Sequence, residues 1–308
     1  MPVIILGSIN TDLVVRVAHL PNPGETVLGG EFYCAGGGKG ANQAVAAARA
    51  ASQPVTFIAS LGRDPYGEQA LANFRQEGIA TDFIKRSALP TGVALIMVDE
   101  RGENMISVAS GANLDLRPSD VDAVSDEAFR AAKVFLACLE SPLDAVARGL
   151  ARAKAAGLLT VLNPAPLTSP RDVCELLAQV DVLTPNEGEL RALTGEGQPG
   201  TKTSESVAAM VQQAQAMGCR RVVVTLGSQG CHVVDGSQSF HVAGHSVQAI
   251  DATGAGDAFN GALAVALAEG RPLPEAAAWA NRAAALSVQR AGAQPSLPNR
   301  SEIDAFAP

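Results

Sequence analysis

The sequence predicts an α/β fold: a Rossmann-like three-layer αβα sandwich with a mostly parallel central sheet and a small β-sheet lid. Three observations support this prediction. Alanine-rich helical stretches alternate with short apolar runs, and repeated β-then-α units give a parallel sheet covered on both faces. Two further segments read as period-2 strands with no helix between them. The apolar runs, typical of strands buried on both faces, span residues 3–6, 55–61, 134–139, 158–162, 181–184 and 222–226.

Helix boundaries between these strands are marked by capping residues. Ser141 is expected to be the N-cap of one helix, with Pro142 at its first position. A second helix is expected over residues 207–217, and Gly218 should end it.

The two segments that break the alternation are residues 12–35 and 92–109. Each contains turn signals between period-2 runs, which indicates hairpins. We expect them to form a small antiparallel sheet that lies over the main sheet as a lid and, if its outer face is apolar, contacts a second subunit. The sequence contains no linker composition or internal repeat, so residues 1–308 are predicted to form a single domain.

Charge and composition exclude several classes of protein. The 308 residues include 23 Lys+Arg and 31 Asp+Glu, a net charge of -8, which argues against a nucleic-acid-binding protein. No apolar run approaches the ~20 residues that a membrane span needs, and no signal peptide is recognisable at the start. The 5 cysteines form no CxxC pair, and an odd count suits a reducing compartment. We therefore expect a cytoplasmic protein.

The strongest local motif runs from Asp251 to Asp257. A β-like segment at 247–250 leads into the glycine-rich turn 254–256 (Gly254, Ala255 and Gly256), which opens an apolar helix. Backbone N–H groups of such a turn point in one direction, and the helix N-terminus adds positive charge, so the turn is a candidate anion hole for a phosphoryl group.

Asp257 directly follows this turn. A carboxylate beside an anion hole repels bound phosphate unless it has another purpose, and accepting a proton from an attacking hydroxyl is such a purpose. The alternative is that Asp257 merely caps the helix. Because a helix N-terminus stabilises negative charge, we expect it to lower the pKa of Asp257, so orientation would matter more than basicity.

A second glycine-rich motif covers residues 36–44. It departs from the Walker pattern, because Gly40 stands where a hydroxyl should bind magnesium, and it is not a dinucleotide fingerprint. Gly38 permits close approach of a ligand, and Lys39 and Asn42 offer donors that suit a polyhydroxy ligand. A plain loop-to-helix turn is the alternative.

Polar residues also follow several predicted strands. Asn10 and Asp12 share one face after the first strand, Glu140 ends the strand at 134–139, and Asn186 and Glu189 lie at the start of a helix. Each could be a solvated cap, but open α/β sheets bind ligands at the carboxyl ends of their strands. These residues therefore converge on one expected site.

Taken with these residues, the sequence resembles the phosphofructokinase-B-type carbohydrate kinase family over essentially its whole length. Two signature regions, residues 36–44 and 251–261, carry the resemblance. Residues 163–166, 185–189 and 225–230 also match the family pattern.

The resemblance implies ATP-dependent phosphorylation of D-ribose at its 5-hydroxyl, with Asp257 as the base. It assigns the sugar to Asn10, Asp12, Gly38, Lys39, Asn42 and Glu140, and the nucleotide to Asn186, Thr225, Gly227, Gly230, Gly256 and Asn281. Glu189 is associated with Mg²⁺, and a K⁺ ion near the anion hole is assigned to Asp251, Thr253, Ser287, Arg290, Gly292 and Ser296. The family lid joins two subunits, which implies a homodimer.

Two kinds of alternative remain. Another family member could act on deoxyribose, fructose or a nucleoside, since Asp12, Lys39 and Glu140 suit several polyols. A non-catalytic sugar-binding sensor would keep the sugar residues but has no use for an acid after an anion hole. A dinucleotide oxidoreductase is excluded, because no glycine fingerprint follows the first strand.

Overall fold

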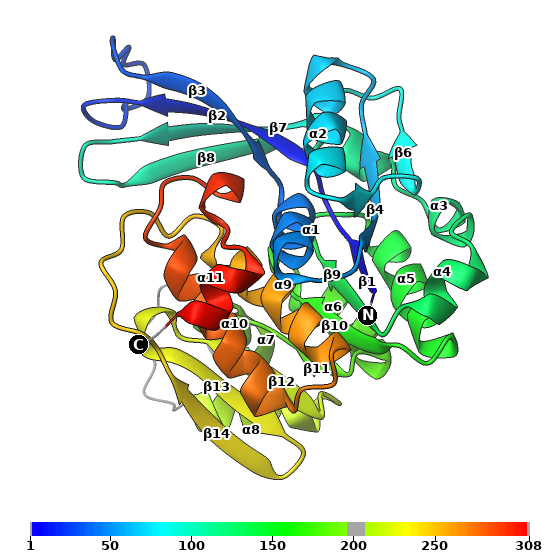
Figure 1. The fold of residues 1–308 in the computed structure, drawn as a ribbon. Coiled ribbons are helices and arrows are strands. Elements are labelled where there is room, and N and C mark those ends of the chain that lie inside the picture. The colour runs from blue at the N-terminus through cyan, green and yellow to red at the C-terminus, as the bar shows by residue number, and fades with distance from the viewer. Residues whose placement is uncertain (1, 196–206, 307–308) are drawn as a thin grey trace.

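A single twisted sheet forms the centre of the molecule (Figure 1). The computed structural model describes residues 2–195 and 207–306. The strand order is β14-β13-β12-β11-β10-β9-β1-β4-β5, with β6 also paired to β4; pairing is parallel except at β13 and β14. The strands are β1 (Val3–Leu6), β4 (Val55–Leu61), β5 (Ile79–Ala80), β6 (Ile84–Arg86), β9 (Val134–Cys138), β10 (Leu159–Asn163), β11 (Val182–Leu183), β12 (Arg221–Thr225), β13 (Gly230–Asp235) and β14 (Gln238–Ala243).

Helices cover both faces of this sheet. One face carries α1 (Lys39–Ala50), α2 (Pro65–Gln76), α9 (Ala255–Ala268), α10 (Leu273–Ser287) and α11 (Arg300–Ala305). The other carries α3 (Pro118–Asp122), α4 (Asp126–Ala131), α5 (Leu143–Ala155), α6 (Pro170–Leu176), α7 (Glu187–Thr194) and α8 (Val207–Ala216). Short 3₁₀ turns connect them: η1 (Gly111–Asp115), η2 (Leu177–Gln179), η3 (Gly227–Gln229) and η4 (Gln294–Ser296). The predicted three-layer αβα architecture is confirmed.

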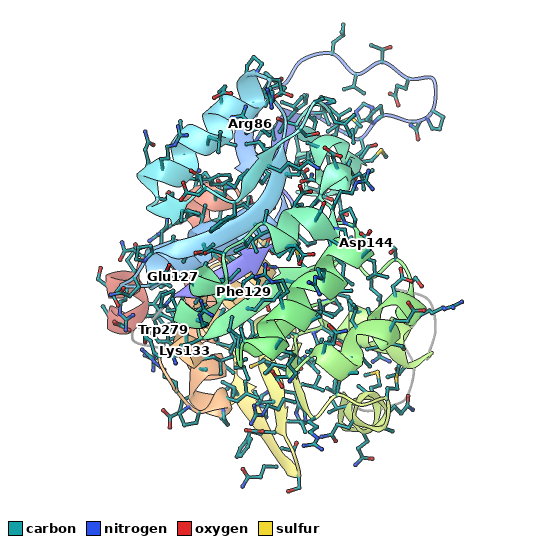
Figure 2. All side chains as sticks on the ribbon, turned by 90° about the vertical axis from the view of Figure 1, so that its right-hand side faces the viewer. Arg86, Glu127, Phe129, Lys133, Asp144 and Trp279 are labelled. Carbon is teal, nitrogen blue, oxygen red and sulfur yellow. The ribbon has the colours of Figure 1, made fainter. Side chains whose placement is uncertain are left out.

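Two separate cores result from the alternation of strand side chains. In β1, Val3 and Ile5 pack on the α9 side, whereas Ile4 and Leu6 pack on the α5 side. Figure 2 labels an aromatic residue from each core, Phe129 and Trp279. The Phe129 ring stacks on Phe135 of β9 with centroids 6.2 Å apart.

The predicted strands agree with the structure to within two residues at each end, and 3–6 and 55–61 agree fully. Two local predictions are wrong. Pro142 is extended (φ -53°, ψ 133°) and is itself the N-cap of α5, so Ser141 does not cap this helix. Residues 247–250 form no strand, because they run beside the end of α10, where Ile250 N–H bonds to the Val288 carbonyl instead of a strand.

The lid is a separate four-stranded sheet of order β3-β2-β7-β8 that projects from one end of the main sheet (top left in Figure 1). Its strands are β2 (Asn10–Arg16), β3 (Phe32–Gly37), β7 (Gly92–Val98) and β8 (Asn104–Ala109). The expected antiparallel sheet is wrong in its central pair, since β2 and β7 are parallel. Both strands lead outward from the main sheet, and each returns through its own hairpin.

None of the helices in the described part of the chain is long and apolar enough to cross a membrane.

Candidate active site

Two close helix contacts bring the candidate site together. A Cβ atom on Gly40 of α1 would lie 2.4 Å from Ser8 N, and one on Gly261 of α9 would lie 2.7 Å from Gln43 O. Only glycine allows these approaches, so α1 packs tightly against both the end of β1 and α9. The start of α1 is thereby placed between the sheet edge and Asp257.

Three carboxylates and one ammonium group converge here, and the space among Asp12, Lys39, Glu140 and Asp257 is called the cleft below. The charges of Glu140 and Asp257 act on the carboxyl of Asp12, and those of Glu140 and Lys39 act on the carboxyl of Asp257. Glu140 Oε2 accepts hydrogen bonds from the backbone N–H of Lys39 at 2.9 Å and from the Ser8 hydroxyl. Burial opposes the charge of Lys39, but the carboxylates of Asp257 and Glu140 outweigh burial and raise the pKa of its ammonium. Lys39 is therefore a permanent cation in the cleft.

Asp257 lies in the first turn of α9, next to Gly254, whose φ of 77° is left-handed. Asn42 Nδ2 donates to its Oδ2 at 2.9 Å, and Gln43 Nε2 donates to its Oδ1 at 3.1 Å. The carboxylate thus bonds to side chains of α1, which does not fit the alternative that it merely caps α9.

The prediction that the pKa of Asp257 is lowered is wrong, because the shift is in the opposite direction. Burial raises the pKa of this carboxyl, although Lys39 and the two amide donors act to lower it. The side chain is only 6% exposed, so the loss of water outweighs the helix N-terminus. A raised pKa makes Asp257 a better proton acceptor than the sequence suggested.

Asn10 and Gly38 lie where the lid joins the rest of the chain, at the start of β2 and directly after β3. Asn113 of η1 donates from Nδ2 to Asn10 Oδ1 at 2.8 Å, and its own Oδ1 accepts the Ile9 N–H at 2.8 Å. Asn10 therefore has its Nδ2 group to offer a ligand. Gly38 (φ 87°) precedes α1, where a Cβ would lie 2.7 Å from Asn10 N.

Asp12 of β2 points to the same cleft from the lid. Burial, reinforced by Glu140 and Asp257, raises the pKa of Asp12 to about 6. In the unfolded chain the pKa of this carboxyl is about 3.9. Between these values the folded state binds more protons, so Asp12 makes stability fall as the pH rises through this window.

Asp12→Asn is consequently expected to raise Tm by a few degrees at pH 8, because the amide carries no buried charge. The gain should shrink as the pH falls through 6 and vanish below about 4, where Asp12 is neutral in both states. Thermal unfolding of both proteins from pH 4 to 8 measures this difference. A gain that is independent of pH would contradict the assignment.

A pocket of about 310 Å³ lies beyond Gly256, between β12, β13, α9 and α10. Its walls include apolar Phe259 and Val288. Of the residues predicted to bind nucleotide, it is lined by Thr225, Gly227, Gly230, Gly256 and Asn281. An apolar pocket with the candidate anion hole at its mouth suits a flat base that carries phosphates.

Asn186 is the remaining residue predicted to bind nucleotide. Its backbone pairs with Thr225 in an isolated β-bridge, and its side chain forms a capping box with Glu189. Asn186 Oδ1 accepts the Glu189 N–H at 2.7 Å, and Glu189 Oε2 accepts the Asn186 N–H at 2.8 Å. Burial raises the pKa of Glu189, and both Lys39 and Asp257 affect its charge. Glu189 therefore borders the cleft as well as capping α7.

The residues assigned to K⁺ lie around the turn that precedes α9. Asp251 Oδ1 accepts the Thr253 N–H at 2.9 Å, and its Oδ2 accepts the Gly292 N–H at 2.8 Å. Although burial opposes its charge, the Thr253 and Gly292 donors hold the pKa of Asp251 below its usual value. Ser287, Arg290 and Ser296 come from the end of α10 and the loop after it. The side chains of Asp251, Thr253, Ser287 and Ser296 in this set carry oxygen donors, the kind that hard cations prefer. No cluster of three His, Cys, Asp or Glu that could hold a metal occurs in residues 2–195 and 207–306.

Several residues of the site were missed from the sequence. Ser8, Gln43 and Asn113 all hold a predicted site residue. All three are buried polar residues, and Ser8 stands among buried neighbours directly after the apolar run 3–6. Asn113 has exposed Leu114 beside it, so its local sequence carries no such signal.

The fold and the cleft together are those of a kinase that acts on a small polyol. The model of the pfkB family carbohydrate kinases matches residues 2–300, and the chain belongs to this family. Its relatives include the ribokinase of Haemophilus influenzae, with 42% identity over 303 residues, which cover 98% of this chain and 97% of that protein.

Solved structures of ribokinases share the fold. The ribokinase of Arabidopsis thaliana complexed with ribose and ATP superposes with a TM-score of 0.88 at 33% identity, over 99% of both chains. The ribokinase of Thermotoga maritima gives a TM-score of 0.87 at 35% identity, over 98% of both chains.

Proposed function

We propose that the protein catalyses ATP-dependent phosphorylation of D-ribose at its 5-hydroxyl, giving D-ribose 5-phosphate and ADP. The observation that carries this proposal is the buried Asp257 carboxylate, which lies in the first turn of α9 directly after Gly256, a lining residue of the 310 Å³ pocket. The ribokinase relatives, one solved with ribose and ATP, support the choice of both substrates.

The chain's own groups account for each part of the reaction. Asp12 and Glu140 accept hydrogens from sugar hydroxyls, while Asn10, Lys39 and Asn42 donate to sugar oxygens, and these bonds orient the 5-hydroxyl. Asp257 takes the hydroxyl proton as the O5–phosphorus bond forms and the bond from γ-phosphorus to ADP breaks. The main-chain amides of Gly254 and Gly256 stabilise the charge that develops on the phosphoryl oxygens. The amide of Ala255 already donates to the Ala252 carbonyl at 3.2 Å.

The test is ADP formation with D-ribose, deoxyribose, fructose and adenosine as acceptors. We expect kcat/KM to be highest for D-ribose. A higher value for another acceptor would identify a different family activity, and sugar binding without ADP formation would favour the sensor alternative.

Two ions belong to this proposal. Mg²⁺, bound with ATP, would supply positive charge to the phosphates, and Glu189 would assist in holding it. K⁺ would be held by Asp251, Thr253, Ser287, Arg290, Gly292 and Ser296, and it would supply charge beside the anion hole. The oxygen donors and the lowered pKa of Asp251 support this assignment.

Asp251→Ala is expected to blunt the activation by K⁺, since it removes the one carboxylate of that set. ADP formation is measured with and without KCl at saturating D-ribose, and Asp172→Ala on α6 is the control. A response to K⁺ equal to that of the unmodified protein would refute the assignment.

We also propose that the lid joins two copies of the chain into a homodimer. The lid face opposite Asp12 carries largely exposed apolar side chains: Phe32 (60%), Leu95 (56%) and Met105 (48%) share this face by strand register. Such an apolar surface is typical of a subunit contact.

Leu95→Glu is expected to give monomers, because it places a charge on the lid face opposite Asp12. Leu114→Glu is the matched control, since Leu114 is equally exposed (57%) but lies in η1. Sedimentation or light scattering measures the mass. A monomeric unmodified protein would contradict the proposal.

The cytoplasmic location expected from the sequence completes the proposal. All five cysteines are free thiols, as expected for a reducing compartment.

A further inference from the structure

A continuous chain of buried polar side chains runs beneath the cleft. Gln43 of α1 donates from Nε2 both to Asp257 Oδ1 and to Asn163 Oδ1, each at 3.1 Å. Asn163 ends β10 and donates from Nδ2 to the Thr184 carbonyl at 3.0 Å. The chain therefore starts at the Asp257 carboxylate and crosses two strands of the sheet.

The same chain returns to the candidate anion hole. The Thr184 hydroxyl donates to Asn260 Oδ1 at 2.6 Å, and Asn260 Nδ2 donates to the Gly256 carbonyl at 2.8 Å. The carboxylate of residue 257 and the backbone of residue 256 are thus connected through α1, β10, β11 and α9. Gln43 contacts the Asp257 carboxylate directly, whereas it reaches the Gly256 backbone only through three further residues.

Packing alone does not explain a glutamine at position 43. The residue is 0% exposed, and its Oε1 atom has no hydrogen-bond partner in the described part of the chain. A buried amide oxygen without a partner carries a desolvation cost. Leucine or methionine would fill a similar volume without this cost, so the Nε2 donor is the useful part of the side chain.

The donor restricts the orientation of the Asp257 carboxylate. The terminal torsion of an aspartate is broad, and one hydrogen bond leaves the plane of the carboxylate free to turn. Asn42 holds Oδ2 at 2.9 Å and Gln43 holds Oδ1 at 3.1 Å, so both oxygens are fixed from α1. Each oxygen keeps a lone pair, and the fixed plane determines where it points.

We propose that Gln43 is a positioning residue for the phosphoryl transfer proposed above. It fixes the plane of the Asp257 carboxylate so that a free lone pair faces the acceptor hydroxyl, and it does so without touching the substrate, since it is fully buried. The inference rests on the proposed function, because it needs Asp257 to accept a proton.

Gln43→Leu removes the donor and tests the proposal. We expect kcat with D-ribose to fall roughly 10–10²-fold, as misorientation of a reacting group does, while KM for D-ribose and ATP stays within about threefold. Gln43→Met keeps the length of the side chain and serves if the leucine impairs folding, which Tm reports. Ser60→Ala is the control, since it changes another buried polar atom without a partner in the described chain, away from this network.

A double-mutant cycle separates positioning from a structural role. In the Asp257→Asn background, Gln43→Leu should change the remaining kcat by less than about twofold, because the group it orients is gone. Losses that multiply, or a single variant with normal kcat, would overturn the proposal. Absence of D-ribose phosphorylation by the unmodified protein would instead refute the proposed function, so the two failures are distinguishable.

Discussion

Asp257→Asn is expected to lower kcat by roughly 10²–10⁴-fold, the range for loss of a general base. The amide has nearly the same shape but cannot accept the hydroxyl proton. Sugar affinity should remain within a few-fold, because Asn10, Asp12, Lys39 and Glu140 are unchanged. Turnover comes from ADP formation, and the dissociation constant for D-ribose comes from calorimetry.

Glu127→Gln is the matched control for this variant. Glu127 is an exposed acid of α4 on the other face of the sheet, labelled in Figure 2. The same change from acid to amide should leave turnover unaffected there. Near-normal turnover of Asp257→Asn would remove Asp257 from the mechanism.

Gly256→Val is expected to lower kcat/KM for ATP by at least about 10²-fold with little change in Tm. A Cβ atom on Gly256 meets nothing within 4 Å, so the fold accommodates it, but this open space borders the pocket proposed for the nucleotide. The added side chain would occupy the approach of the phosphates to the amides. Steady-state kinetics with varied ATP measures the loss.

Gly254→Ala provides the contrast. Gly254 has a φ of 77°, and its Cβ would lie 3.2 Å from Ala293 Cα, so alanine there should cost roughly 1–2 kcal/mol of stability. Calorimetric unfolding should therefore show a lower Tm for Gly254→Ala than for Gly256→Val. The reverse order would contradict this assignment of the turn.

The parts of the fold and site that could be predicted are those marked by local sequence motifs. The strands, the glycine-rich turns and the polar residues at strand ends are encoded within a few neighbouring residues each. The partners of Asp257 are not, because Asn42 and Gln43 reach it through the packing of α1 against α9. The pKa of Asp257 depends on burial by the same packing, which the local sequence does not specify.

The errors in the fold have a similar origin. Residues 247–250 have strand-like composition, but no neighbouring strand is available where they run beside α10. The parallel pairing of β2 and β7 is set by where both leave the main sheet, which depends on topology rather than on either segment's sequence.

Gly40 and Gly261 have a consequence for engineering the specificity of this protein. Because of these two glycines, helix α1 packs against the end of β1 and against α9 with no space for a further atom. Even a methyl group at either position would separate the groups that α1 aligns. Directed evolution toward other acceptors should therefore keep both glycines and diversify the lid strand β2, where changed side chains can be accommodated by small shifts of the lid.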